Sequence, residues 1–198
     1  MSSLESRRQL YVGLFLICLM MATRGHHFAS IYHLPDASWA VFFLAGAYLR
    51  PSWTFYALCT LAVAIDWAAI TWGGVSSFCV TLAYVMLLPA YGSLWLGGRW
   101  HARHHRKSSV ALLPLIGSVL VSACTAEILS SGSFYFFGGR LATPVFADFL
   151  RREIEFFPAM LETMALYVGL AVLVHGVLAV CGPRDGKGRH PLTSGLDQ

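Results

Sequence analysis

Long apolar runs alternate with short polar or Gly/Pro breaks along most of the chain. A bilayer-spanning helix needs about 20 largely apolar residues, because backbone polar groups inside lipid must be satisfied within the segment. We therefore interpret the runs as membrane spans, of which the pattern predicts six. They lie near Gln9–Ala22, Ser38–Leu49, Ser52–Ile70, Val75–Leu96, Ser109–Leu129 and Phe157–Cys181.

The composition agrees with a membrane domain. Only 12% of the residues are charged, whereas a soluble domain carries roughly 25%. We expect residues 1–182 to form a single six-helix membrane domain and residues 183–198 to form a cytoplasmic tail. The five scattered cysteines show neither a disulfide framework nor a CxxC metal pattern.

The distribution of basic residues predicts the orientation in the membrane. Six spans place most of them on one side of the bilayer, and an excess of Lys and Arg marks the cytoplasmic side. These residues are Arg7, Arg8, Arg50, Arg99, Arg103, Arg106, Lys107, Arg184, Lys187 and Arg189. We therefore expect an all-α integral membrane protein with both termini in the cytoplasm. The net charge of +4 follows from this topology and predicts no nucleic-acid partner.

Three carboxylates lie within apolar runs, namely Asp66, Glu127 and Glu162. A charge at the centre of a span costs about 2.5–3.5 kcal/mol on insertion scales, so such residues mark function or a need for pairing. In the predicted topology all of them fall in the outer third of their spans. This clustering favours a polar cavity that faces outward. The alternative is that some of these side chains simply reach the outer interface.

The last outer loop carries a second group of polar residues. Ser130–Pro144 is rich in glycine and aromatic residues, and Val145–Phe156 has the pattern of an amphipathic helix. Its polar positions are Asp148, Arg151, Arg152 and Glu155. Either these charges pair with one another on an interfacial helix, or one of the two arginines is not part of these pairs and contacts a ligand instead.

Histidines and cysteines supply further candidate ligands. His26, His27 and His33 lie in the first outer loop, where histidines either bind a metal or are simply exposed. Cys79 and Cys124 lie in the outer halves of their spans. A thiolate suits a transition metal better than Mg²⁺ or Ca²⁺. The cluster His101, His104 and His105 is interpreted as part of a solvated cytoplasmic loop, with metal binding as the alternative.

Several of these segments together resemble the BtuM family. They are RGHHFASIYHLPDASWAVFFLAGAYLR, AVAIDWA, SSFCVTLAY and LRREIEFFPAMLE, and they span roughly Gly25 to Glu162. The family consists of small bacterial inner-membrane proteins proposed to take up cobalamin. Its members are similar in fold to the six-helix S-components of energy-coupling factor transporters. The resemblance therefore implies an S-component-like protein in the bacterial inner membrane with an outward-facing cobalamin site.

The resemblance also implies roles for individual residues. Cys79 matches the family cysteine that ligates the cobalt of cobalamin, and His27 matches a first-loop histidine at the site. Asp66, Tyr84 and Arg152 match residues that contact or organise the ligand. We expect His27 to be a candidate for the opposite axial position of the cobalt, because the first loop covers the site from outside.

Chemistry at the cobalt follows from a thiolate ligand. Coordination by a metal lowers the pKa of a thiol, so no dedicated base is required. A thiolate in one axial position gives a base-off complex, and a strongly donating sulfur weakens the bond trans to it. The resemblance accordingly implies cysteine-mediated decyanation of cyanocobalamin. The first span, YVGLFLICLMMA, lacks a small-xxx-small docking patch, which predicts a solitary protein without an ATP-driven module.

Two other functions fit parts of the pattern. The first is an exosortase-like membrane cysteine transpeptidase that uses Cys79 or Cys124 as its nucleophile. It predicts a protein substrate and no coloured ligand. The second is a divalent-metal permease that uses the first-loop histidines. It predicts metal binding that survives the loss of Cys79.

Overall fold

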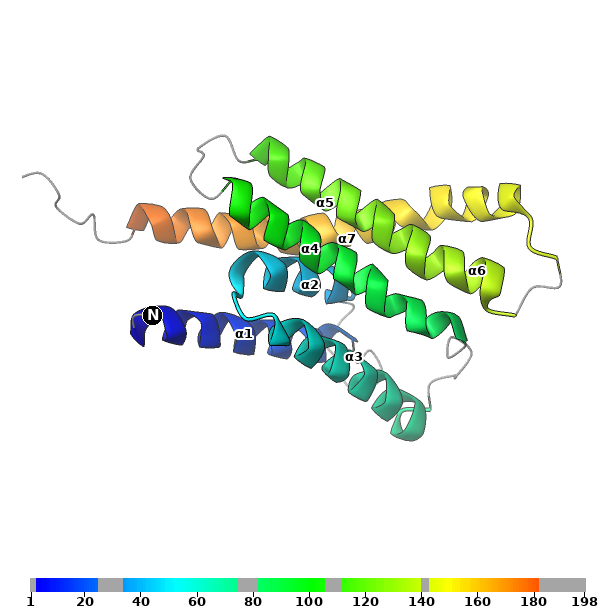
Figure 1. The fold of residues 1–198 in the computed structure, drawn as a ribbon, viewed down its shortest axis with the longest axis horizontal. Helices are drawn as coiled ribbons and strands as arrows, with labels where there is room; N and C mark the ends of the chain where they lie inside the picture. The colour runs from blue at the N-terminus through cyan, green and yellow to red at the C-terminus, as the bar shows by residue number, and fades with distance from the viewer. Residues whose placement is uncertain (1–2, 25–33, 75–81, 106–111, 140–142, 182–198) are drawn as a thin grey trace, which may run out of the picture.

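The computed structural model describes residues 3–24, 34–74, 82–105, 112–139 and 143–181, and every regular element in these ranges is helical. The elements are α1 (Ser3–Arg24), α2 (Ser38–Tyr48), α3 (Trp53–Trp72), the 3₁₀ helix η2 (Leu82–Met86), α4 (Leu87–His105), α5 (Leu112–Glu127), the π-helical turn η3 (Ile128–Gly132), α6 (Ser133–Phe137) and α7 (Phe146–Cys181). The helices lie roughly along the long axis of the molecule (Figure 1). The predicted tail, residues 183–198, lies outside the described ranges.

Three stretches of helix are long and apolar enough to cross a membrane: Trp53–Trp72, Leu112–Phe137 and Phe146–Leu178. Large apolar side chains cover their outer surfaces, among them Trp67, Leu113, Val121, Ile154 and Leu173. So much exposed apolar surface is rare on a soluble monomer, whereas a lipid environment accommodates it. Helix length and surface are therefore both compatible with a membrane protein.

The short helix α2 forms the centre of the bundle, with α1, α3, α4 and α7 around it (Figure 1). Every residue from Ser38 to Gly46 is buried, as expected for a helix that is apolar on all sides. A Cβ added to Gly98 would lie 1.9 Å from the carbonyl oxygen of Phe43, so glycine lets the α2 and α4 backbones touch. With 11 residues, α2 is about 17 Å long and shorter than the roughly 30 Å hydrocarbon layer.

The end of α4 differs from the sequence-based expectation. The helix continues to His105, so Arg99, Arg103 and the histidine cluster lie on a helix instead of in a loop. The Arg99 guanidinium donates to the carbonyl oxygens of Leu49 (2.9 Å) and Arg50 (2.8 Å). Hydropathy marks only the part of a helix that suits lipid, so it cannot locate an end that extends beyond the bilayer.

The segment that joins α5 to α7 also differs from expectation. Ser130–Pro144 was predicted to be a loop, but the chain stays helical through η3 and α6 to Phe137. The predicted amphipathic helix and the last span form one continuous helix, α7, with Pro158 inside it. Proline is tolerated within membrane helices because neighbouring groups compensate for the missing backbone hydrogen bond.

Candidate functional site

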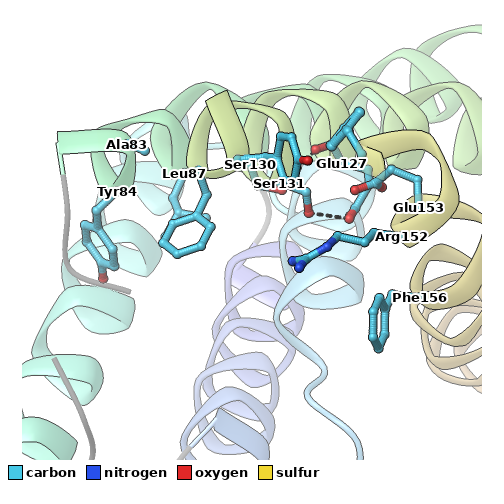
Figure 2. A pocket seen from close by; sticks show the side chains of 12 residues that line it. Ala83, Tyr84, Leu87, Glu127, Ser130, Ser131, Arg152, Glu153 and Phe156 are labelled. Carbon is cyan, nitrogen blue, oxygen red and sulfur yellow. Dashed lines mark hydrogen bonds between the residues drawn. The ribbon is translucent and has the colours of Figure 1, made fainter. Parts of the chain in front are cut away.

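A cavity of about 360 Å³ lies at the end of the bundle where α4 and α7 begin (Figures 1 and 2). We call it the Arg152 cavity. Its lining residues are Ala83, Tyr84, Leu87, Glu127, Ser130, Ser131, Phe134, Tyr135, Phe149, Arg152, Glu153 and Phe156. Mostly apolar walls with a few convergent polar groups are typical of a small-molecule site.

The π-helical turn brings carboxyl and hydroxyl groups to the wall of this cavity. Glu127 is buried at the end of α5, and the Ser131 hydroxyl donates a hydrogen bond to it (Figure 2). Glu153 on α7 lines the same cavity. π-helical turns are frequent at functional sites because the extra residue per turn re-aims side chains. Acceptors from α5, from the turn and from α7 thus surround one space.

Arg152 brings a positive charge to the cavity. Its guanidinium carbon lies 5.7 Å from the centre of the Tyr135 ring, within the range of a cation–π contact. Its neighbour Arg151 lies 3.4 Å from the Asp148 carboxylate and is mostly exposed. Arg152 forms no ion pair with any side chain that the structure describes. Of the two arginines, therefore, Arg152 is the one available to an anionic or amide-rich ligand.

Asp66 is the centre of an ionic cluster next to the cavity. The Arg24 guanidinium binds it through both carboxylate oxygens, with Nε–Oδ1 and Nη2–Oδ2 distances of 2.6 and 2.7 Å. The Tyr84 hydroxyl donates a third hydrogen bond to Oδ2 at 2.6 Å. Since Tyr84 also lines the Arg152 cavity, the cluster and the cavity are contiguous.

Arg24 connects this cluster to the start of α2 and to α4. Its Nη1 donates to the Ser38 hydroxyl at 2.9 Å and to the Tyr91 hydroxyl at 2.7 Å. Burial alone lowers the pKa of the Arg24 guanidinium, but Asp66 and Tyr91 outweigh that effect and leave the pKa above its ordinary value. The guanidinium therefore stays charged, and it holds the adjoining ends of α1, α2, α3 and α4 together.

Of the residues that the sequence singled out, Tyr84 and Arg152 line one cavity, and Asp66 contacts Tyr84 without lining it. Cys79 and His27 lie outside the described residues, as do His26 and His33. The predicted roles of all of these residues remain predictions.

The expectation that three carboxylates face one cavity holds only in part. Glu127 lines the cavity, and Asp66 reaches it through Tyr84. Glu162 is exposed on α7 and is absent from the lining. A helix presents a new face every residue, so similar depth in the membrane does not ensure a shared direction. Cys124 is likewise exposed on α5 and away from the cavity.

Two residues of the site escaped the sequence analysis. The basic-residue pattern does not single out Arg24, although Asp66 inside an apolar run requires a positive partner and Arg24 follows the outer end of the first predicted span. Glu153 belongs to a charged segment whose pattern gives no sign of which side chain faces inward. Within the described ranges, no three His, Cys, Asp or Glu side chains gather as a metal site would require.

The chain matches no protein-family model, and no curated protein is significantly similar to it.

Proposed function

We propose that the protein takes up cobalamin across the bacterial inner membrane and binds it at the Arg152 cavity. One observation carries the proposal. Tyr84 and Arg152, which the BtuM resemblance matches to ligand-contacting positions, line the same cavity although they are far apart in sequence. A third matched residue, Asp66, is hydrogen-bonded to Tyr84. Three of the five matched residues thus lie close together.

The proposal includes six spans with both termini in the cytoplasm. The Arg24 cluster supports alternating directions, because it joins the end of α1, the start of α2, the end of α3 and the start of the η2–α4 segment. With the basic residues of the opposite end in the cytoplasm, the Arg152 cavity faces outward. In this arrangement α2 enters only part of the bilayer depth, and the surrounding helices cover it.

The cavity offers groups that suit a corrinoid. Arg152 can donate hydrogen bonds to the carbonyl oxygens of corrin amides. The Tyr84 hydroxyl, which donates its proton to Asp66, and the Glu127 carboxylate can accept from the amide N–H groups. The walls formed by Leu87 and by Phe134, Phe149 and Phe156 suit the apolar rim of the ring. Cobalamin is larger than a drug-sized molecule, so a cavity of about 360 Å³ holds one side of it and the remainder extends toward the outer surface.

Cys79 and His27 supply the axial ligands in this proposal. Cys79 precedes Leu82, the first residue of η2, by three positions in the sequence, and η2 carries Tyr84. Its thiolate binds Co(III) in the base-off form, and His27 approaches the opposite face. Decyanation is then a ligand exchange. A Co–S bond would replace the Co–N bond to dimethylbenzimidazole, with the thiol proton released to water. Cyanide would then leave the opposite face as the anion, with His27 or water taking its place and no change in the oxidation state of the cobalt.

Absorption spectroscopy of the purified protein tests this proposal. Wild-type protein from cells grown with cobalamin is expected to carry the ligand and to show a thiolate-type cobalt spectrum. Cys79→Ala should lose that spectrum, whereas Cys124→Ala, a change at an exposed position outside the cavity lining, should keep it. Colourless wild-type protein would contradict the proposal and leave the transpeptidase and metal-permease alternatives. Metal binding that persists in Cys79→Ala would favour the permease.

A further inference from the structure

A second, larger cavity of about 1100 Å³ lies at the opposite end of the bundle, where α1 begins and α4 and α7 end (Figure 1). We call it the Arg99 cavity. Helices α1, α2, α4, α5 and α7 all contribute to it. Its charged lining includes Arg8, Arg50, Arg99, Arg103 and Glu5. No residue assigned to the cobalamin site lines this cavity.

The charges around the Arg99 cavity are unbalanced. Four arginines line it against a single carboxylate, Glu5, which lies 2.6 Å from Arg50 in an ion pair. One guanidinium nitrogen of Arg99 donates hydrogen bonds to the carbonyl oxygens of Leu49 and Arg50, and the guanidinium stacks on the Trp95 ring. Arg8 and Arg103 form no hydrogen bond or ion pair with the part of the chain that the structure describes. Three guanidinium charges thus lack a carboxylate.

These charges also interact with one another. Partial burial, together with the positive charge of Arg103, lowers the pKa of Arg99. An anion between the two side chains would remove this repulsion. Phosphate oxygens suit the position, because the planar guanidinium donates two parallel hydrogen bonds to them.

The deeper walls of the cavity are apolar. On α1, Val12 lies one turn beyond Arg8, and on α7, Val168 and Val172 precede His175 by one to two turns. Leu115 of α5 lines the same space. The cavity therefore has a positively charged rim at the helix ends and an aliphatic interior toward the middle of the bundle. This is the polarity of a phospholipid.

We propose that the Arg99 cavity binds the phosphodiester headgroup of an anionic phospholipid, with its acyl chains along the aliphatic wall. Basic pockets between membrane helices on the cytoplasmic side are suited to anionic headgroups. A free phosphate or a nucleotide shares the phosphate chemistry but has no acyl chain for the Val12, Val168 and Val172 wall. The proposal is independent of cobalamin and holds whether or not the Arg152 cavity binds it.

Lipid titration of the purified full-length protein by native mass spectrometry tests this inference. The probes are phosphatidylglycerol and phosphatidylcholine with identical acyl chains. Wild-type protein is expected to prefer phosphatidylglycerol. The double variant Arg8→Gln/Arg103→Gln should bind it about 30-fold more weakly, since each basic group near a headgroup contributes about a fivefold gain in affinity. Binding of phosphatidylcholine should weaken much less, because its choline cation offsets the charge of its phosphodiester.

Three controls keep the test decisive. Arg151→Gln removes an exposed arginine at the other end of the bundle and should leave the lipid preference unchanged. Arg8→Lys/Arg103→Lys keeps the charge and should recover most of the affinity, which excludes misfolding as the cause of a loss. Inorganic phosphate and ATP are added as competitors. Equal binding of both lipids, an unaffected double variant, or displacement of phosphatidylglycerol by micromolar ATP would overturn the proposal.

Discussion

At the scale of single residues, the ionic cluster explains how charges are accommodated inside an apolar bundle. The Arg24 side chain is 10% exposed and that of Asp66 is 26% exposed. Burial of either charge alone is costly, and a bidentate pair with extra hydrogen bonds offsets that cost. Tyr84, Ser38 and Tyr91 supply those extra bonds. The cluster therefore links the ends of four helices and holds Tyr84 beside the cavity.

Asp66→Asn should destabilise the protein substantially, because it leaves the Arg24 charge largely buried without its counter-ion. Loss of one partner of a fully buried pair costs about 3–5 kcal/mol, and partial exposure of this pair reduces the loss to about 2–3 kcal/mol. Thermal unfolding of the ligand-free protein in detergent measures the change. Glu162→Gln is the matched control, and it should shift the stability by less than about 0.5 kcal/mol. Equal losses in both variants would contradict the role given to the cluster.

Arg152→Gln should weaken cobalamin binding about tenfold or more, because a charged donor to a buried ligand is lost. Its ligand-free stability should stay close to that of the wild type, since Arg152 has no ion pair with a described residue. Titration of the ligand-free protein with cobalamin, followed by absorbance, measures the affinity. Arg151→Gln should bind as the wild type does. An unchanged affinity in Arg152→Gln would exclude this side chain from the site.

The sequence predicted only some of the residues of the site, because hydropathy shows how deep a residue lies in a span but not which way its side chain points. A carboxylate inside an apolar run stands out, which identified Asp66 and Glu127. The same signal wrongly assigned Glu162 to the cavity, because depth along a helix carries no information about direction around it. Arg24 lies at the end of a run, where an arginine in an ion pair looks the same as one in a loop.

At the scale of elements, close packing between α2 and α4 determines the geometry of the core. Gly46 and Gly98 lie where the two backbones touch, and a Cβ on Gly46 would lie 2.0 Å from the Trp95 carbonyl oxygen. Such contacts provide dispersion energy that apolar lipid tails cannot match. They also explain why α2 can be short, since its neighbours surround it on every side.

Gly98→Ala should therefore destabilise the bundle by about 3 kcal/mol, because the new methyl group meets a backbone carbonyl that cannot move aside. Thermal unfolding in detergent measures the effect. In Gly169→Ala the added methyl group meets nothing within 4 Å. That variant should be as stable as the wild type or up to about 1 kcal/mol more stable, through its higher helix propensity. A well-tolerated Gly98→Ala would contradict the close α2–α4 contact.

The positions of the helices followed from the sequence better than their ends did. Each predicted span overlaps a described helix, because apolar runs mark the segments that lipid or core can accommodate. The ends of α4, α6 and α7 depend instead on local contacts. Ser130, for example, donates to the Ala126 carbonyl oxygen at 2.8 Å within the π-helical region. Hydropathy does not report such hydrogen bonds, so it cannot predict the helix ends that depend on them.

At the scale of the whole molecule, the two cavities lie at opposite ends of one bundle. The Arg152 cavity combines carboxylates, hydroxyls and a single arginine, whereas the Arg99 cavity is strongly basic. This polarity agrees with the positive-inside pattern. In the proposed topology the first cavity takes ligand from outside, and the second holds lipid of the cytoplasmic leaflet.

Reporter fusions test this topology. A green fluorescent protein fused after Gln198 should fluoresce, and alkaline phosphatase fused at the same point should be inactive, because both termini are proposed to lie in the cytoplasm. Phosphatase fused after Gly139, between α6 and α7, should be active. The opposite pattern would invert the orientation and place the Arg152 cavity in the cytoplasm.

Uptake of cobalamin by cells tests the central claim most directly. A cobalamin-dependent bacterial strain that lacks its own importer is supplied with wild-type protein, Cys79→Ala, Arg152→Gln or Arg151→Gln at equal expression, and accumulation of radiolabelled cobalamin is measured. Wild type and Arg151→Gln should accumulate cobalamin and restore growth, and Cys79→Ala and Arg152→Gln should be impaired. No accumulation with the wild-type protein would contradict a role in cobalamin uptake.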